Sequence, residues 1–414
     1  MPVIKVLYLS YDGMTDPLGQ SQVLPYLVAL TSKGYQFTIL SFEKKERFKK
    51  EKKTIDDIVS KAGINWVPLE FTSKPPLLSK FYDVIRMRYT AYRLHKKFRF
   101  DMVHCRSYLG ADIGLSMKKR FGTKFLFDMR GFWADEKKDA GSWDLRNPIF
   151  KKVYKYYKKR EIEYLNNADY TISLTEAGKR EMLTWKAYDK KVPIQVIPCC
   201  ADMSVFSLTS KEDKIKGRKL LGIDENRLVI SYLGSIGAWY MLDEMLEMFR
   251  YIKMSYPEAL FLFITHSQPE LILNRLAAHS IQPEDVKITE AKRAEVPQFI
   301  KASDINISFI KAAYSKISSS PTKLAEVLAM GIPVISNAGV GDVEEIITRA
   351  KAGIVIKDFS DEDYQKVVKY IPDLLRADAA SIRNNTCDLF SLEYGVTLYS
   401  RVYQEVLGTE NRRS

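Results

Sequence analysis

The sequence predicts an α/β protein with two domains, each built on a parallel sheet. Short β-rich segments alternate with segments of helical periodicity, which is typical of parallel α/β architecture. This pattern stops near residue 200 and begins again near residue 228. The 414 residues, of which 46% are hydrophobic, are enough to form two hydrophobic cores.

The expected elements follow in order along the chain. In the first half we expect strands at 3–10, 36–42, 64–69, 101–104, 124–128, 169–173 and 194–198. We expect helices between them at 20–33, 46–61, 78–98, 110–120, 147–166 and 175–186. In the second half we expect strands at 228–233, 259–265, 285–289, 304–309, 333–336 and 353–356. After the last strand, residues 390–407 predict an amphipathic helix.

The net charge of +13 is unevenly distributed along the chain. Residues 1–200 contain 38 Lys and Arg against 22 Asp and Glu, whereas residues 201–414 contain 26 against 29. The first half therefore suits an anionic partner. No nucleic-acid-binding motif is recognisable, so we expect an anionic membrane surface and no nucleic acid.

Two segments, 80–100 and 150–160, concentrate cations and aromatic residues. Both suit a helix that lies on anionic lipid with its aromatic residues at the interface. The alternative is that they are solvated helices whose aromatic residues face the core.

The expected compartment follows from the N-terminus and the cysteines. Residues 1–10 pass directly into a strand pattern, so we expect no signal peptide. No uncharged apolar segment approaches the roughly 18 residues that a membrane span needs. The cysteines form no CxxC or Cys/His cluster, which argues against structural zinc and a disulfide framework. We expect a cytoplasmic protein, peripheral on the inner face of the membrane.

The most informative segment is 318–339, with the sequence SSSPTKLAEVLAMGIPVISNAG. It predicts a Ser/Pro loop, a short helix that begins at Thr322 and ends before Gly331, and a buried strand. The first amides of such a helix are unpaired and can bind a phosphate, so Thr322 and Lys323 are candidate residues for binding the phosphates of a nucleotide. Glu326, one turn later, can bind a diol such as the ribose of a nucleotide. The alternative is an ordinary amphipathic helix and strand at the edge of a sheet.

The segment PTKLAEVLAMGIPVI resembles the donor-binding segment of the family 4 glycosyltransferases, the retaining group with the GT-B fold that is also called glycosyl transferases group 1. The resemblance implies two facing Rossmann-like domains with a central cleft, and Glu326 on the nucleotide ribose. Residues 196–206 resemble the family's connection between domains, and a terminal helix of such enzymes often returns to the first domain. We therefore expect domains at 1–200 and 201–389, and a returning helix at 390–414.

The loop after the first strand ends at the start of a helix. Gly19 permits close approach of the backbone to a ligand, and the amides that follow could face a phosphate. In the family, a glycine-rich loop at this place closes over the donor, so Gly19 and Gln20 are predicted donor-binding residues. The alternative is a plain turn.

The fourth strand ends in His104, Cys105 and Arg106, where family members commonly have a histidine near the donor sugar. Arg106 stands at the place of that histidine, and its permanent charge could stabilise a leaving phosphate. We predict catalytic roles for Arg106 and His104. His104 could instead be a core residue with satisfied hydrogen bonds.

The segment 127–136, after the fifth strand, combines charged and aromatic residues. Arg130 could reach a phosphate and is predicted to be catalytic. Trp133 could stack on a sugar, while Asp135 or Glu136 could orient an acceptor hydroxyl, so these three are predicted acceptor-binding residues. The alternative is a loop network that only stabilises the fold.

The segment 231–240 corresponds to a family segment that normally carries an Arg and a Lys for the donor diphosphate. Gly234 and Ser235 are predicted to contact the donor, but neither cation is present. The candidate replacements are Arg106, Arg130 and Lys323. A second departure is Ser318, which replaces the first glutamate of the family's paired motif and leaves the identity of the sugar open.

Residues 361–363 form a DxD pattern, the metal motif of the other glycosyltransferase fold. Because they follow Ser360 at the predicted start of a helix, we interpret them as capping residues. We expect no metal and no cofactor, the nucleotide sugar being a co-substrate.

The sequence therefore predicts a membrane-associated, metal-independent glycosyltransferase. It would move a sugar from a nucleotide diphosphate donor to a glycan, with retention as the resemblance implies, and a lipid-linked saccharide suits the basic first half. Two alternatives stay open. One is a GT-B nucleotide-sugar epimerase or hydrolase, for which only His104, Asp128, Asp135 and Glu136 could supply acid or base. The other is a non-catalytic binder of nucleotide or anionic lipid.

Overall fold

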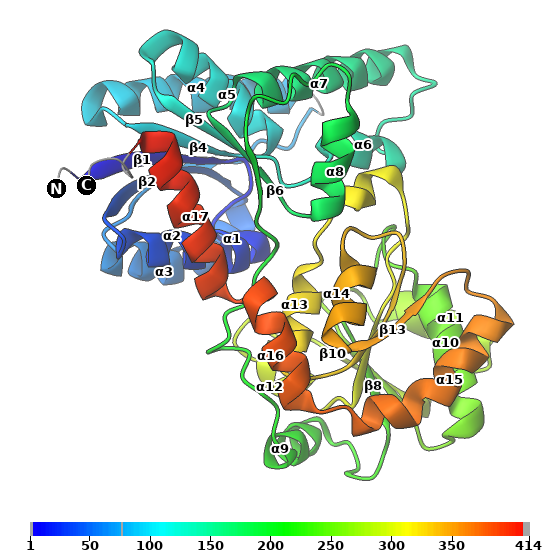
Figure 1. The fold of residues 1–414 in the computed structure, drawn as a ribbon. Coiled ribbons are helices and arrows are strands. Elements are labelled where there is room, and N and C mark those ends of the chain that lie inside the picture. Colours follow the sequence, from blue (N-terminus) through cyan, green and yellow to red (C-terminus); the bar gives the residue numbers. More distant parts are fainter. Residues whose placement is uncertain (1–2, 76–77, 409–414) are drawn as a thin grey trace. The chain divides into compact units, whose positions relative to one another are not determined.

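The computed structural model describes residues 3–75 and 78–408 (Figure 1). The chain divides into two compact units, which we describe one at a time. Unit 1 contains the residues up to Pro198 together with those from Leu392 onward. Unit 2 runs from Cys199 to Ser391.

Unit 1 contains a seven-stranded parallel sheet with the order β3-β2-β1-β4-β5-β6-β7. Its strands are β1 (Ile4–Ser10), β2 (Tyr35–Glu43), β3 (Asn65–Glu70), β4 (Met102–Arg106), β5 (Lys124–Asp128), β6 (Tyr170–Ser173) and β7 (Ile194–Val196). All seven strands predicted for this half are confirmed. The order reverses between β1 and β4, which creates the topological switch point where doubly wound sheets bind ligands.

The helices of unit 1 connect these strands, and the final helix of the chain joins them. They are α1 (Pro17–Gln22), α2 (Leu24–Thr31), α3 (Lys45–Lys61), α4 (Leu78–Phe98), α5 (Ser107–Phe121), α6 (Trp133–Asp139), α7 (Pro148–Asn167), α8 (Glu176–Thr184) and α17 (Leu392–Leu407). The last helix packs against α2 and β5 (Figure 1). The predicted terminal helix is therefore present, and it belongs to unit 1.

Two local predictions in unit 1 were wrong. The helix expected at 20–33 is broken at Val23, because Pro25 in the first turn of α2 has no amide hydrogen to continue the hydrogen bonding of α1. The loop expected after β5 contains helix α6, which begins at Trp133. Its seven residues are too few to show a helical period in the sequence.

Unit 2 repeats this architecture with a six-stranded parallel sheet, in the order β10-β9-β8-β11-β12-β13. Its strands are β8 (Val229–Leu233), β9 (Leu260–Ile264), β10 (Val286–Thr289), β11 (Ile305–Ser308), β12 (Val334–Asn337) and β13 (Gly353–Ile356). Its helices are α9 (Lys211–Leu221), α10 (Leu242–Ser255), α11 (Glu270–Leu276), α12 (Val296–Ile300), α13 (Thr322–Ala329), α14 (Val343–Ala350), α15 (Asp361–Arg376) and α16 (Ala379–Phe390). Short 3-10 helices lie at η1 (Ala277–His279), η2 (Pro283–Asp285) and η3 (Tyr314–Ser318). The second switch point lies between β8 and β11.

The second sheet is buried on both faces, as parallel sheets usually are. Along β8, Val229 and Leu233 belong to one hydrophobic cluster, and Ile230 and Tyr232 belong to the other. This alternation arises because successive side chains of a strand point to opposite faces. Helices α13, α14 and α16 contribute to the first cluster, and α10 and α15 contribute to the second.

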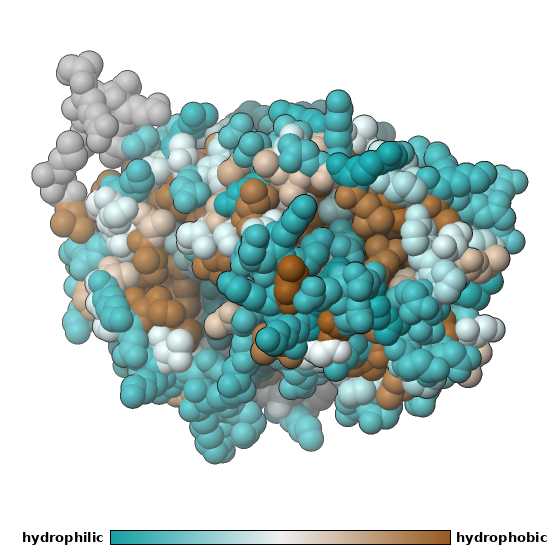
Figure 2. Space-filling view, turned by 90° about the horizontal axis from the view of Figure 1, so that it is seen from below, coloured by the Kyte–Doolittle hydropathy of each residue, from teal (hydrophilic) through white to brown (hydrophobic). Residues whose placement is uncertain are grey.

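The surface shown in Figure 2 is largely hydrophilic, with hydrophobic residues in separate groups among the hydrophilic ones. Within residues 3–75 and 78–408, no helix is both long and apolar enough to cross a membrane.

The DxD pattern lies at the start of α15, where Ser360 Oγ accepts a hydrogen bond of 3.2 Å from the Asp363 amide. Asp363 Oδ2 also accepts a bond of 2.9 Å from the Asp358 amide. These bonds confirm the predicted capping role. Among the described residues, no group of three or more His, Cys, Asp or Glu side chains could hold a metal ion.

Candidate functional site

In unit 2, helix α13 forms near the switch point as the sequence predicts. Pro321 is its N-cap residue, and no side chain of the described residues caps its first amides. The helix ends before Gly331, whose φ is +73°. A Cβ at Gly331 would lie 2.5 Å from the carbonyl oxygen of Ala379, so a larger residue would be both strained and obstructed. The N-terminus of α13 can therefore accept an anion.

Glu326 of α13 is 1% exposed, and both of its carboxylate oxygens have a cationic partner. Lys323 Nζ lies 3.0 Å from Oε2. The guanidinium of Arg293, from the segment after β10, forms an ion pair with Oε1. Sequence reasoning missed Arg293, because it lies 33 positions from Glu326 and matches no motif.

The loop after β8 depends on a glycine at Gly234, where φ is +152°. A Cβ there would lie 2.9 Å from the hydroxyl oxygen of Tyr232. That hydroxyl donates a hydrogen bond of 2.7 Å to the carbonyl oxygen of Ser235. The Ile236 amide in turn donates to Ser267 Oγ at 2.7 Å. The predicted donor-binding residues Gly234 and Ser235 thus belong to a loop that is held in one conformation.

A further cation lies at the same switch point, on a residue that sequence reasoning did not select. Lys316 of η3, in the connection after β11, is 8% exposed. Its ammonium nitrogen is 3.8 Å from the centre of the Trp239 ring, and Trp239 follows β8. An ammonium over an indole face is a favourable cation–π contact. The replacements predicted from the sequence were Arg106, Arg130 and Lys323, and Lys316 was not among them.

In unit 1, Arg106 is the last residue of β4, at the first switch point. It is 4% exposed, and its Nε donates a hydrogen bond of 3.4 Å to Asp12 Oδ2. Its Nη1 is buried and has no hydrogen-bond partner among the residues that the structure describes. A buried guanidinium with an unused donor is costly in isolation, and it suits a ligand that brings acceptor oxygens.

The backbone is strained where β4 and β5 end. Ser107, directly after Arg106, has a φ of +62°, and Arg130 has a φ of +56°. Residues other than glycine rarely adopt such conformations, and they concentrate at functional sites. Arg130 Nη1 lies 3.9 Å from Asp128 Oδ1. Two predicted catalytic residues, Arg106 and Arg130, are thus placed at adjacent strand ends.

His104 is buried, and both of its ring nitrogens have partners within unit 1. Nδ1 lies 2.7 Å from the hydroxyl of Tyr403 on α17, and Nε2 lies 3.3 Å from Asp128 Oδ2. Burial lowers the pKa of His104, although Asp128 acts in the opposite direction. These contacts favour the core interpretation of His104, and its catalytic role stays an untested prediction.

The loop after β1 is held by Glu43 at the end of β2. Glu43 Oε1 accepts a hydrogen bond of 2.8 Å from the Met14 amide, and Oε2 accepts one of 3.0 Å from the Thr15 amide. A Cβ at Gly19 would lie 2.2 Å from the carbonyl oxygen of Gly13, so the close approach that Gly19 permits is to the chain's own backbone. The side chain of Gln20 donates to the Thr15 carbonyl at 3.2 Å. Whether Gly19 and Gln20 contact a donor stays a prediction.

Helix α6 carries the three predicted acceptor-binding residues. Asp135 is buried, and it accepts a hydrogen bond of 2.7 Å from the Tyr154 hydroxyl and one of 2.8 Å from Lys158 Nζ. Trp133 is partly exposed, and its ring packs edge-on against Trp143. Glu136 is also partly exposed. The geometry therefore favours a stabilising role for Asp135, and the acceptor-binding roles of Trp133 and Glu136 stay predictions.

Two sequence models of glycosyltransferase families match the chain. Glycosyltransferase Family 4 matches residues 22–205, and Glycosyl transferases group 1 matches residues 213–385. The chain belongs to these glycosyltransferases. The resemblance inferred from the segment 318–339 is thereby confirmed. No curated protein matches this glycosyltransferase.

Several solved structures resemble the glycosyltransferase over nearly its whole length. A sucrose-phosphate synthase from Thermosynechococcus elongatus has a TM-score of 0.72 at 13% identity, covering 98% of this chain and 100% of that one. HepE from Anabaena, in complex with UDP and glucose, has a TM-score of 0.69 at 12% identity, covering 97% and 99%. WaaG, a glycosyltransferase involved in lipopolysaccharide biosynthesis, has a TM-score of 0.66 at 13% identity, covering 97% and 99%. At these identities the likeness establishes the fold, which is GT-B.

Proposed function

We propose that this glycosyltransferase moves a sugar from a nucleotide diphosphate donor to a glycan acceptor. The observation that carries the proposal is the site at the start of α13. An uncapped helix N-terminus there lies beside a buried carboxylate that is paired with Lys323 and Arg293. The binding of UDP and glucose by HepE, a protein of similar fold, supports this kind of donor.

The donor would be bound by unit 2 in two parts. The ribose hydroxyls would donate to Glu326, since a carboxylate can accept about four hydrogen bonds and its two cations leave acceptor capacity free. The diphosphate would lie at the α13 amides and Lys323. Lys316 is our candidate for part of the charge that the absent Arg and Lys supply elsewhere in the family, because it lies buried at the switch point.

Arg106 and Arg130 are the catalytic candidates of unit 1. When the bond between sugar and phosphate breaks, negative charge develops on the leaving phosphate, and a guanidinium fixed in place stabilises it. The rigid, strained strand ends would hold these groups without reorganisation. Retention of configuration and independence from metal ions are parts of the proposal.

The acceptor we propose is a lipid-linked saccharide at the cytoplasmic face of a membrane. Five large apolar side chains of α4 are between 48% and 68% exposed: Leu78, Phe81, Tyr82, Ile85 and Tyr89. Their spacing places them on one face of the helix. For these side chains the alternative of a core-facing position does not hold, although Phe100, also in segment 80–100, is buried. An exposed apolar face between cations suits the interface of an anionic membrane.

The test is an incubation of the full chain with a panel of nucleotide sugars, with and without a panel of lipid-linked saccharides. Mass spectrometry should detect a glycosylated product and a released nucleoside diphosphate only when an acceptor is present. Conversion or hydrolysis of the nucleotide sugar without acceptor would support the epimerase or hydrolase instead. Absence of both nucleotide binding and turnover would overturn the proposal.

A further inference from the structure

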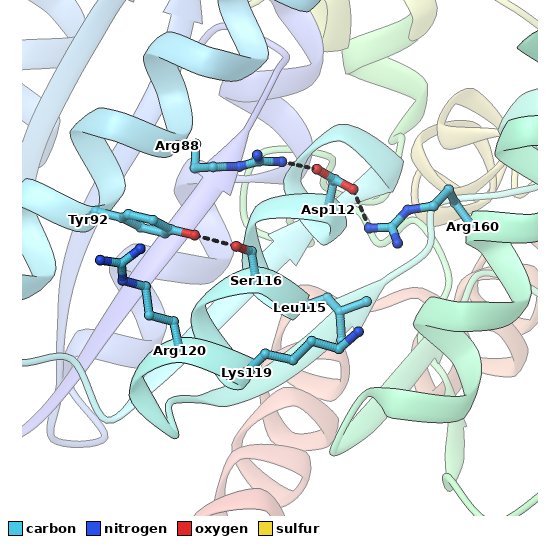
Figure 3. Close-up of a pocket in the computed structure, with 8 residues that line it drawn as sticks. All are labelled: Arg88, Tyr92, Asp112, Leu115, Ser116, Lys119, Arg120 and Arg160. Carbon is cyan, nitrogen blue, oxygen red and sulfur yellow. Dashed lines mark hydrogen bonds and ion pairs between the residues drawn. The ribbon is translucent and has the colours of Figure 1, made fainter.

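A basic groove lies on unit 1, away from the strand ends described above. Helix α5 packs between α4 and α7 (Figure 1), and the groove between these three helices has a volume of about 440 Å³. Figure 3 shows its polar lining, of which six residues matter here: Arg88, Tyr92, Asp112, Lys119, Arg120 and Arg160. Because α5 begins at the end of β4, Arg120 in its last turn lies roughly 20 Å along the helix from that strand end. The groove is therefore separate from the candidate catalytic residues.

The cations of the groove outnumber the carboxylates that they contact. Asp112 pairs with both Arg88 and Arg160 (Figure 3). Lys119 Nζ lies 2.9 Å from Glu163 Oε1, and Arg160 shares that carboxylate. Three cations thus share two carboxylates, which leaves an excess of positive charge.

Two arginines of the groove have N–H donors without an acceptor among the described residues. The guanidinium of Arg120 lies 5.4 Å from the centre of the Tyr92 ring and forms no ion pair. The Nε of Arg88 is buried and has no hydrogen-bond partner. Guanidinium groups match the oxygens of a phosphate in geometry and charge. The volume lies within the range of small-ligand sites, and the lining selects a polar anion.

The groove continues from the exposed apolar face of α4. Phe81, Ile85, Arg88 and Tyr92 follow one another at helical spacings of four, three and four residues. A lipid whose chains contact the apolar face would therefore bring its headgroup to the cations. Free phosphate compounds share the headgroup's chemistry, but they do not account for the adjoining apolar residues.

We propose that the groove between α4, α5 and α7 binds the phosphate headgroup of an anionic membrane phospholipid. Arg120 supplies the most accessible guanidinium, and Lys119 and Arg88 contribute further donors. The site would fix the protein's position on the membrane, beyond the diffuse attraction of its basic surface. It rests on the membrane association in the proposed function, and it does not depend on sugar transfer.

The test is co-sedimentation of the full chain with vesicles of phosphatidylcholine, with and without phosphatidylglycerol. We expect binding only to the anionic vesicles, and Arg120→Gln should weaken it about tenfold, the usual effect of losing one charged hydrogen bond. The matched control is Arg93→Gln, which removes the same charge from an exposed position on α4 outside the groove and should change binding less than twofold. Thermal unfolding of each variant establishes that the fold is retained.

Three outcomes would overturn the proposal. Equal losses in Arg120→Gln and Arg93→Gln would indicate diffuse electrostatic attraction, and an unchanged Arg120→Gln would exclude the groove. The third outcome comes from calorimetry with glycerol phosphate. If the protein binds glycerol phosphate as tightly as it binds anionic vesicles, the groove is a site for a free phosphate compound. UDP binding is measured on the same samples. A variant that loses vesicle binding but keeps UDP binding shows that the groove and the donor site are independent.

Discussion

The two switch points of this glycosyltransferase differ in how their charged groups are used. At the second, Lys323 lies in the first turn of α13 and Arg293 in the segment after β10, and both pair with Glu326, while Lys316 in the connection after β11 lies over the Trp239 ring. At the first, His104 and Asp128 are bound to each other and to residues of α17. The sheets have the same strand order over six strands, so topology does not cause this difference.

Two units with the same strand order therefore carry different arrangements of charged groups at their switch points. At the start of α13, Glu326 pairs with two cations and no side chain of the described residues caps the first helix amides, as a site for an anionic ligand requires. At the first switch point, His104 and Asp128 are held by hydrogen bonds within unit 1, and the buried Nη1 of Arg106 has no hydrogen-bond partner among the described residues. Substitutions at the two switch points should therefore have different effects on donor binding, catalysis and stability.

Glu326→Ala should have the largest effect. It removes the acceptor of the ribose hydroxyls and leaves Arg293 and Lys323 without their carboxylate, so kcat/KM for the nucleotide sugar should fall on the order of 100-fold or more. Steady-state kinetics and calorimetry with UDP measure this loss. Glu326→Gln is the matched control, because it keeps the shape and loses the charge. If both variants retain the parent's UDP affinity, Glu326 does not bind the donor.

Lys316→Met tests whether the second switch point binds the diphosphate through this lysine. Methionine keeps an unbranched stem against Trp239 and removes the charge, so the affinity for UDP should fall by about 10- to 100-fold. The affinity for uridine, which has no phosphate, should stay within about twofold. Equal losses for UDP and uridine would instead indicate that the variant disturbs the loop around Trp239.

The strands and most helices could be predicted because each depends on local patterns of hydrophobicity and helix boundaries. Strand β8 and helix α13 were both found in this way. Partners that come from distant connections could not be predicted. Arg293 reaches Glu326 from the segment after β10, and Lys316 meets Trp239 across the switch point. These contacts join residues that are far apart in the sequence and share no motif, so the sequence does not indicate them.

For the same reason, the structural roles of Asp135 and Glu43 in unit 1 could not be predicted from the sequence. The sequence shows that Asp135 follows a strand end, where ligand-binding residues are common, but it does not show Lys158 and Tyr154 approaching from α7. Glu43 carries no motif at all, although it holds the loop after β1 through several hydrogen bonds. Such roles depend on which helices and loops pack together.

Arg106→Gln and His104→Gln test whether Arg106 has a catalytic role and His104 a structural role at the first switch point. Arg106→Gln should lower kcat about 10- to 100-fold, because it removes a charge that stabilises the leaving phosphate. His104→Gln should leave kcat within about threefold and lower the free energy of unfolding by about 1–3 kcal/mol, because Tyr403 and Asp128 lose a buried partner. Kinetics and chemical denaturation separate the two effects. A loss of kcat in His104→Gln without loss of stability would restore its catalytic assignment.

Glu161→Gln should have the smallest effect on transfer, and it tests whether the acid residues around α6 and α7 form an internal network. Burial raises the pKa of Glu161 to about 7, although Lys158 opposes that shift. The unfolded chain, with an ordinary glutamate pKa near 4.5, loses this proton first as the pH rises. The stability that the protonated group contributes is therefore fully present below pH 4.5 and is lost as the pH rises through about 7.

Denaturation at pH 5 and pH 8 measures this loss. The unfolding free energy of the parent, relative to Glu161→Gln, should decrease between the two by at most about 3 kcal/mol. Glutamine stays neutral and can still accept from the Tyr108 hydroxyl, which contacts Glu161 in the parent. A pH-independent difference would mean that Glu161 is ionised throughout. The acid residues around α6 and α7 would then not form the internal network that we infer for unit 1.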